Sequence, residues 1–250
     1  MQKLTKKMHF YLFKFALRLT IFGVMIALYI KDKVRFYQYT ITSIKGGINF
    51  MHLMWAVFMC LMISHIFPTK VISMGCGKMV KTNFVPVPNY SETKLMQFVH
   101  ERNIKAWKSM IAWLSGNFVI GILYFLKIIG NAEILLISGF YFVSDYICIL
   151  IFCPFQTFIQ KNKCCVNCRI YDWGHFMMFT PLLLLRTFYG WTLFFMGAVV
   201  IIRWEYMLAK YPERFWEGSN QTLRCENCKD KTCYTKKETA KNFAKVFKIK

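Results

Sequence analysis

Several stretches of this chain run for about 20 residues with almost no charged side chain, and they constrain its fold more than any other feature. A helix of that length is what the hydrocarbon core of a bilayer requires. The chain is 56% apolar, whereas soluble domains contain roughly 45–50% apolar residues. These observations predict an all-α, polytopic integral membrane bundle.

The apolar stretches predict about six transmembrane helices. The first stretch follows a basic start and resembles a signal peptide, but no small-residue cleavage site follows it, so we interpret it as a retained helix. The last stretch, 170–209, is too long for one ordinary span, and "RTFYGW" at 186–191 offers a tight turn. One long helix over 170–209 is the alternative. The predicted spans are 8–30, 50–67, 110–129, 134–155, 170–186 and 191–209.

The net charge of +21 would suggest nucleic acid as the partner of a soluble protein. Here lysines and arginines concentrate in the segments that flank the apolar stretches, a pattern that favours the lipid bilayer as partner and argues against nucleic acid. Six helices with both termini in the cytosol place the basic segments inside, except the loop 31–49. We therefore predict an integral membrane protein of the cell or inner membrane.

Two parts of unequal size are predicted. Residues 1–209 form the transmembrane bundle, including a cytosolic loop at 68–108 and a cysteine-rich loop at 160–169. Within the first loop, 89–107 is expected to form a helix along the membrane surface that leads into the third span. Residues 210–250 form a cytosolic cysteine-rich segment with a basic amphipathic tail.

Two cysteine knots, "KNKCCVNCRIYDWGH" at 161–175 and "RCENCKDKTC" at 224–233, predict a metal lobe on the cytosolic face. Two residues between cysteines let both thiolates reach one ion, and two such pairs supply a tetrahedron. If 170–209 is a helical hairpin, both knots return to the same side and can converge. The candidate ligands are Cys164, Cys165, Cys168, Cys225, Cys228 and Cys233.

The metal is either zinc or an iron–sulfur cluster. Structural zinc held by four cysteines is the commonest use of this spacing. The surplus of cysteines and the short run from Cys225 to Cys233 favour an iron–sulfur cluster. Basic neighbours such as Lys161, Arg169 and Arg224 are expected to lower the thiol pKa values and favour the thiolates.

Asp145 lies near the middle of the fourth predicted span, where an ionisable group is a functional candidate. An ion pair with Arg18 of the first span is one interpretation, and a proton or ion site inside the bundle is the other. Cys76, in "MGCGK", supports no site by itself. His175 could join Asp172 near the metal face, but we prefer to interpret it as an interfacial polar residue.

The first functional hypothesis is electron transfer, with an iron–sulfur cluster that passes electrons between a soluble redox donor and the membrane, for example a quinone. The second is a zinc-bound transporter or scaffold that uses Asp145 and Arg18. A membrane enzyme acting on lipid is a third class, for which the sequence contains no catalytic constellation.

Overall fold

The computed structural model describes residues 6–41, 50–67, 74–162 and 164–231, together with residues 233 and 236. The described residues form helices joined by turns and contain no β-strand, only one isolated bridge. The predicted basic tail lies outside them. The α-helices are α1 (Lys6–Lys31), α2 (Lys33–Ile41), α3 (Phe50–Ile66), α4 (Met74–Gly77), α5 (Glu92–Phe125), α6 (Asn131–Leu150), α7 (Gly174–Phe179) and α8 (Phe188–Lys210).

Four of the described helices, α1, α5, α6 and α8, are long and apolar enough to cross a membrane. A fifth apolar segment, His52–Ile66 of α3, is shorter. Large apolar side chains point outward from these helices, and Phe118 and Phe125 of α5 are 70% and 71% exposed. Such exposure suits a surface covered by lipid. The prediction of an all-α bundle of membrane-type helices is therefore confirmed.

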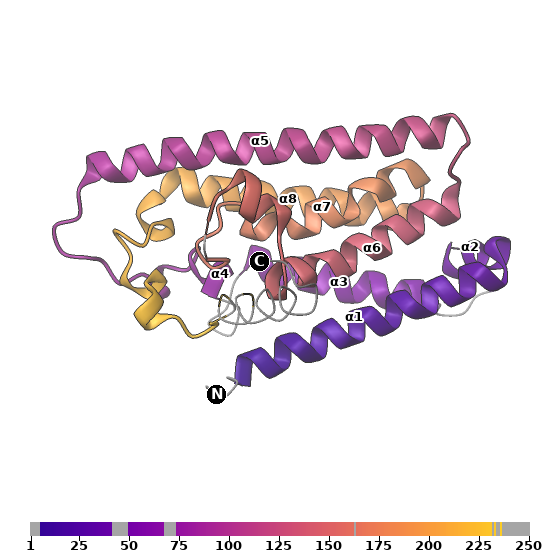
Figure 1. Cartoon of the computed structure of the whole chain (residues 1–250), viewed down its shortest axis with the longest axis horizontal. Coiled ribbons are helices and arrows are strands. Elements are labelled where there is room, and N and C mark those ends of the chain that lie inside the picture. Colours follow the sequence, from indigo (N-terminus) through magenta and orange to yellow (C-terminus); the bar gives the residue numbers. More distant parts are fainter. Residues whose placement is uncertain are drawn as a thin grey trace, which may run out of the picture.

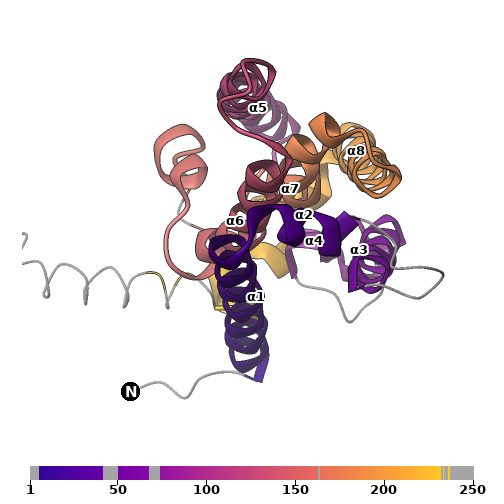
Figure 2. The same cartoon turned by 90° about the vertical axis from the view of Figure 1, so that its right-hand side faces the viewer.

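The long helices run side by side along one axis (Figures 1 and 2). The main core forms where α3, α6, α7 and α8 meet, through Phe58, Ile134, Phe179 and Leu193. α1 packs along α6, and α5 lies along the outside of the bundle (Figure 1). α4 and the segment after α8 lie at the left end of Figure 1, whereas α2 and the turn between α5 and α6 lie at the right end. We call the left end the cysteine-rich end.

The surface helix expected at 89–107 and the third span are one continuous helix, α5, with 34 residues. Ser91 caps its start by accepting a hydrogen bond from the backbone N–H of Lys94. α5 ends at Phe125 rather than at 129, so Lys127 belongs to the turn that follows. The fourth predicted span is shorter than expected and ends at Leu150, before a π-helical turn, η2 (Phe155–Ile159).

The stretch 170–209 folds as two segments, so the single long helix is wrong. The first segment combines α7 with the 3₁₀-helix η4 (Thr180–Leu185), where Pro181 occupies the first turn. Arg186 then adopts a left-handed conformation with φ 46°, which ends the first segment before Thr187 caps α8. The break lies at the start of the predicted turn, and helical turns cover 171–185 of the predicted 170–186, although only Gly174–Phe179 is α-helical.

Gly197 lets α8 approach α7 closely. A Cβ at this position would lie 3.1 Å from the Cα of Phe176 and 3.2 Å from its nitrogen. Because both neighbours are backbone atoms, Gly197→Ala is expected to push the helices apart and to lower stability by about 1–3 kcal/mol. Thermal unfolding in detergent measures this effect. The matched control is Gly116→Ala in α5, where nothing lies within 4 Å; a loss as large there would contradict the packing explanation.

Candidate metal centre

The cysteines of the first knot are held separately at the cysteine-rich end. Cys165 is buried, and its thiol donates to Gln156 Oε1 at 3.3 Å. Cys168 is buried as well, beside the side chain of Lys78. Cys164 is half-buried.

Burial raises the pKa of Cys168 to about 11 and raises the pKa of Cys164 above its usual value. The expectation that basic neighbours lower these thiol pKa values is therefore wrong for both residues. The physical reason is that loss of water around a buried thiol disfavours its charged form more than nearby cations favour it.

The cysteines of the second knot lie near those of the first knot, but among the described residues the two sets do not converge on one common site. Cys228 and Cys233 lie near enough to Cys164 to add to the rise in its pKa. Cys225 is exposed, and Cys228 Sγ accepts from the backbone N–H of Lys231. Within the described part of the chain, none of the six predicted ligands belongs to a group of three or more metal-type donors. Their role as ligands stays a prediction.

A different group of donor atoms comes together at this end: His65, Cys76 and Asp172. His65 Nδ1 lies 2.6 Å from Asp172 Oδ1. Cys76 Sγ lies 3.6 Å from the same nitrogen and 3.4 Å from the same carboxylate oxygen. Cys76 is 1% exposed and Asp172 is 3% exposed, so these two donors are buried, whereas the His65 side chain is 21% exposed.

Three separate elements deliver these side chains. His65 comes from the last turn of α3, Cys76 from the short helix α4, and Asp172 from the 3₁₀-helix η3 (Tyr171–Trp173). Gly75 allows the approach of α4 to η3, because a Cβ there would lie 2.4 Å from the ring of Tyr171. The glycine before Cys76 in "MGCGK" therefore lets Asp172 reach the thiol.

The buried side chain of Lys78 connects the segment after α4 to the cysteine-rich loop. Its Nζ donates to the carbonyl of Cys168 at 3.3 Å and lies over the rings of Trp204 and Phe215. Burial lowers the pKa of Lys78 to about 8, while the thiols of Cys168, Cys164 and Cys76 act in the opposite direction. A buried lysine tied to backbone and aromatic rings holds the thiol-bearing turn in place.

Two polar atoms beside the group are buried without a hydrogen-bond partner among the described residues: Asp172 Oδ2 and His175 Nδ1. The ring of His175 packs edge-to-face on that of His65, with 4.9 Å between their centres. Buried polar atoms are ordinarily paired, so each exception in a native structure needs an explanation such as a ligand. A carboxylate oxygen and an imidazole nitrogen are both metal-binding atoms.

The ion pair predicted between α1 and α6 forms. Arg18 Nη1 lies 2.8 Å from Asp145 Oδ2, and the guanidinium also rests on the rings of Phe142 and Tyr146. A Cβ on Gly174 would lie 3.0 Å from Asp145 Oδ1. The ion pair therefore lies directly beside the segment that carries Asp172 and His175.

Comparison with known proteins does not assign this arrangement to a family. No family model matches the chain, and no curated protein or solved structure matches it. What the group does is therefore inferred from its own atoms.

The geometry fits a metal ion better than a cysteine nucleophile. A Cys–His–Asp relay uses the two different nitrogens of its histidine, one toward the thiol and one toward the carboxylate. Here Cys76 and Asp172 both approach Nδ1 of His65. In a tetrahedral zinc site, sulfur lies about 3.5 Å from nitrogen or oxygen, and nitrogen lies about 3.3 Å from oxygen.

Both distances from Cys76 Sγ already match that tetrahedron. Only the contact between His65 and Asp172 must widen from 2.6 Å, by about 0.7 Å, to admit an ion. One thiolate and one carboxylate would balance the charge of a divalent cation, which lowers the cost of holding it in a buried place.

Sequence reasoning missed His65 and Cys76 as partners because 10 residues separate them and Asp172 lies about a hundred residues further on. The glycines around Cys76 were the available signal, since they indicate close approach of another segment. The preferred interpretation of His175 is an interfacial polar residue, and the alternative places it with Asp172 near the metal face. Their closeness to His65 supports that alternative.

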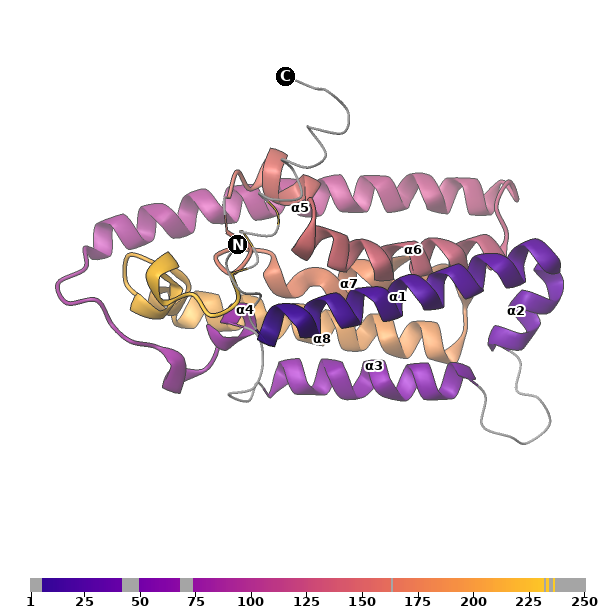
Figure 3. The same cartoon turned by 60° about the horizontal axis from the view of Figure 1, so that its bottom comes forward.

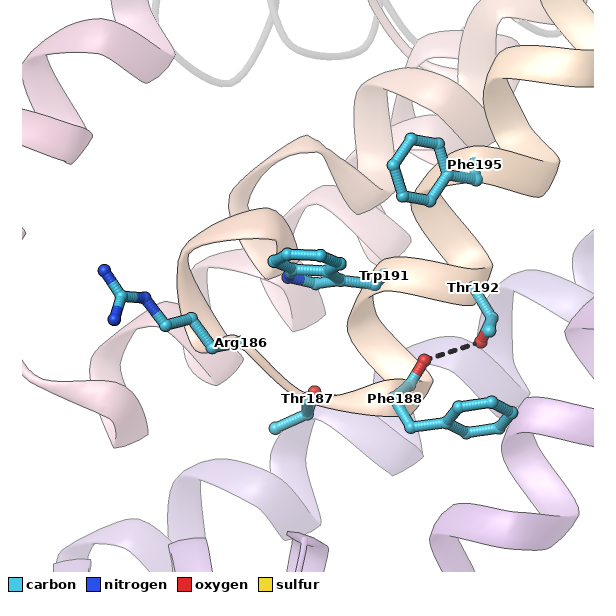
Figure 4. A pocket seen from close by; sticks show the side chains of 6 residues that line it. All are labelled: Arg186, Thr187, Phe188, Trp191, Thr192 and Phe195. Atoms are coloured by element: carbon cyan, nitrogen blue, oxygen red, sulfur yellow. Dashed lines mark hydrogen bonds between the residues drawn. The ribbon is translucent and has the colours of Figure 1, made fainter.

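The opposite end of the bundle holds an open hollow of about 750 Å³ at the start of α8. Its walls are mostly apolar, and the side chain of Arg186 points away from it (Figure 4). Thr192 Oγ1 donates to the carbonyl of Phe188 at 2.8 Å, so this hydroxyl is already paired. Aromatic side chains such as Trp191 are typical of the level of lipid headgroups. No described donor cluster lies there, and we assign it no chemistry.

Proposed function

We propose that this chain is an integral membrane protein that binds one zinc ion through His65, Cys76 and Asp172. The convergence of three different donor types from three elements, in a buried place, carries the proposal. The ion would link α3, α4 and η3 at the cysteine-rich end, where Figure 3 shows α4 beside the left end of α3. This corresponds to the zinc-bound scaffold, although with ligands other than the predicted cysteine pairs.

The donor set favours zinc over an iron–sulfur cluster at this position. One thiolate, one or two imidazoles and one carboxylate are ordinary zinc ligands. Clusters need several thiolates, and the group contains only Cys76. The near-complete burial of Cys76 and Asp172 favours an ion that is held permanently over one that is passed along.

We propose six membrane crossings with the cysteine-rich end in the cytosol. α3 and the pair α7–η4 would add two crossings to the four longer helices, shortened because the bundle surrounds them. Most of the described lysines and arginines outside the α-helices belong to segments at the cysteine-rich end, such as Lys78, Lys161 and Arg169. Lys127 in the turn after α5 and Arg186 before α8 lie at the other end and are exceptions to this pattern, and the basic residues of α2 lie there as well.

Metal analysis of the full chain tests the proposal directly. Protein purified in detergent without oxygen is expected to contain about one zinc per chain and to be colourless. Removing the ion with a chelator should lower the midpoint of thermal unfolding, and adding zinc should restore it, because a ligand bound only to the folded state stabilises that state. Metal-free protein whose unfolding does not respond to zinc would overturn the proposal.

An iron–sulfur electron-transfer protein is the second candidate function. The observation in its favour is the approach of Cys228 and Cys233 to Cys164. In that case the same purified protein would contain iron and acid-labile sulfide and would be brown. A quinone or a soluble donor would then be the partner to look for.

A further inference from the structure

Two cysteines that belong to neither candidate metal site lie against each other where α6 ends. Cys148 is in the last turn of α6, and Cys153 follows shortly after the helix. The thiol of Cys148 donates a hydrogen bond to the sulfur of Cys153, and both side chains are half-buried. Because a disulfide requires two sulfur atoms that can meet, this contact makes the pair a candidate for one.

The sulfur of Cys153 is the better nucleophile of the two. It accepts hydrogen bonds from Cys148 and, at 3.4 Å, from the backbone N–H of Gln156. These bonds lower the pKa of Cys153 to about 7, although burial acts in the opposite direction. The charge of Lys236, whose Nζ donates to Gln156 Oε1 at 2.6 Å, lowers it further. Much of this thiol is therefore ionised at neutral pH, and the thiolate is the form that attacks a disulfide.

The turn that carries Cys153 lies on the surface of the bundle. Phe152 is 46% exposed and Phe158 is 68% exposed, and Pro154 is exposed as well. The neighbours of Cys148 in α6 are partly buried instead. This difference favours Cys153 as the thiol that meets a reacting molecule first.

We propose that Cys148 and Cys153 form a redox-active dithiol that exchanges with an anionic small-molecule disulfide of the glutathione class. An anionic molecule suits this position because the ammonium group of Lys236 lies beside Cys153. The inference does not depend on the proposed zinc site, since neither cysteine belongs to the group of His65, Cys76 and Asp172. It agrees with the proposed cytosolic location of this end, because disulfides in the cytosol are mostly transient and serve catalysis or redox sensing.

The exchange proceeds in two steps. The thiolate of Cys153 attacks one sulfur of the small disulfide, which forms a mixed disulfide and releases one small thiol that takes up the proton lost by Cys153. The sulfur of Cys148 then attacks that of Cys153, which releases the second small thiol with the proton of Cys148. Two cysteine thiols are thereby oxidised to one disulfide, and the small disulfide is reduced to two thiols.

The test uses the full chain, purified in detergent and equilibrated with mixtures of reduced and oxidised glutathione before free thiols are alkylated. Trypsin cleaves after Lys127 and Lys161, and the peptide 128–161 contains no cysteines other than Cys148 and Cys153. Mass spectrometry of this peptide therefore reports on the pair alone. As the share of oxidised glutathione rises, we expect the peptide to lose both alkylation sites together and to lose the mass of the two thiol hydrogens. Peptides that carry glutathione on both cysteines, or that keep both thiols free at every ratio, would overturn the inference.

Single variants test which cysteine attacks. Cys148→Ser is expected to accumulate a stable mixed disulfide on Cys153, because no second thiol resolves it. In Cys153→Ser, the remaining Cys148 is expected to form a mixed disulfide at least about tenfold more slowly, because it lies within the helix and lacks the donors that favour a thiolate. Faster reaction of Cys148 than of Cys153 would contradict the proposal.

The same titration on the wild-type chain unfolded in SDS and urea is a control that does not require a variant to fold. The folded pair should form its disulfide at a concentration of oxidised glutathione at least about tenfold lower, because the fold holds the two sulfur atoms in contact and raises their effective concentration. Equal titrations of the folded and unfolded chains would show that the contact does not favour the disulfide, and the inference would be wrong.

Discussion

Cys76→Ser is expected to reduce bound zinc from about one ion per chain to almost none, because the only thiolate of the group is lost. Stability in the presence of zinc should then fall by about 3–4 kcal/mol, the free energy that a ligand at several hundred times its dissociation constant contributes. Metal analysis and thermal unfolding with and without zinc measure the two effects.

Cys60→Ser is the matched control, since Cys60 is exposed on α3 and belongs to no described donor group. It should leave both zinc content and unfolding unchanged. The proposal is contradicted if Cys76→Ser retains zinc while replacement of Cys165 or Cys168 removes it. That result would show that the cysteine pairs bind the ion.

Glu205→Gln is expected to lower stability by about 1–2 kcal/mol, less than for a fully buried pair because the Glu205 side chain is 39% exposed, which corresponds to a drop of about 2–8 °C in the unfolding midpoint. Glu205 binds Arg169 through both carboxylate oxygens, at 2.7 Å for Nη1. Arg169 is 7% exposed, so the variant leaves a buried guanidinium without its counter-charge. Glu205 also accepts from Trp173 Nε1 at 2.9 Å.

Because Trp173 follows Asp172 in the chain, loosening this contact should weaken zinc binding as well. Glu101→Gln provides the comparison: Glu101 pairs with Lys105 on the surface of α5, and such exposed pairs contribute little. An equal loss of stability in both variants would contradict the view that the partly buried pair of Arg169 and Glu205 holds the cysteine-rich loop against α8.

The helical class of the protein could be predicted from sequence, because the hydrocarbon core of a bilayer offers the backbone no hydrogen-bond partners and helices pair their own backbone groups. A run such as 8–30 must satisfy its own hydrogen bonds, and α1 confirms that stretch almost residue for residue. The end of α5 could not be predicted to the residue, because three of the four residues 126–129 are as apolar as the helix before them. Turn geometry at Lys127, with φ 59°, ends the helix there.

The candidate site was predicted only in part. The pairing of Asp145 with Arg18 followed from the cost of a lone charge in the membrane, which makes a partner of opposite sign necessary. The metal group could not be predicted, because His65 and Cys76 are single residues that no known ligand spacing connects. The prediction of a metal site was based instead on cysteine pairs separated by two residues. Such local spacing is visible in a sequence, whereas the convergence of distant residues in the tertiary structure is not.

By itself, the sequence determined that this chain is a basic, all-helical membrane-type protein with an intramembrane acid that needs a cation. Those properties depend on amino-acid composition and on contiguous segments of the chain, so they can be predicted without knowing which distant residues come into contact. Only the tertiary structure decided that α3, α4 and η3 bring His65, Cys76 and Asp172 within reach of one ion. The physical reason is that close packing, such as that of α4 against η3 at Gly75, rather than any pattern along the chain, sets the distances between side chains far apart in sequence.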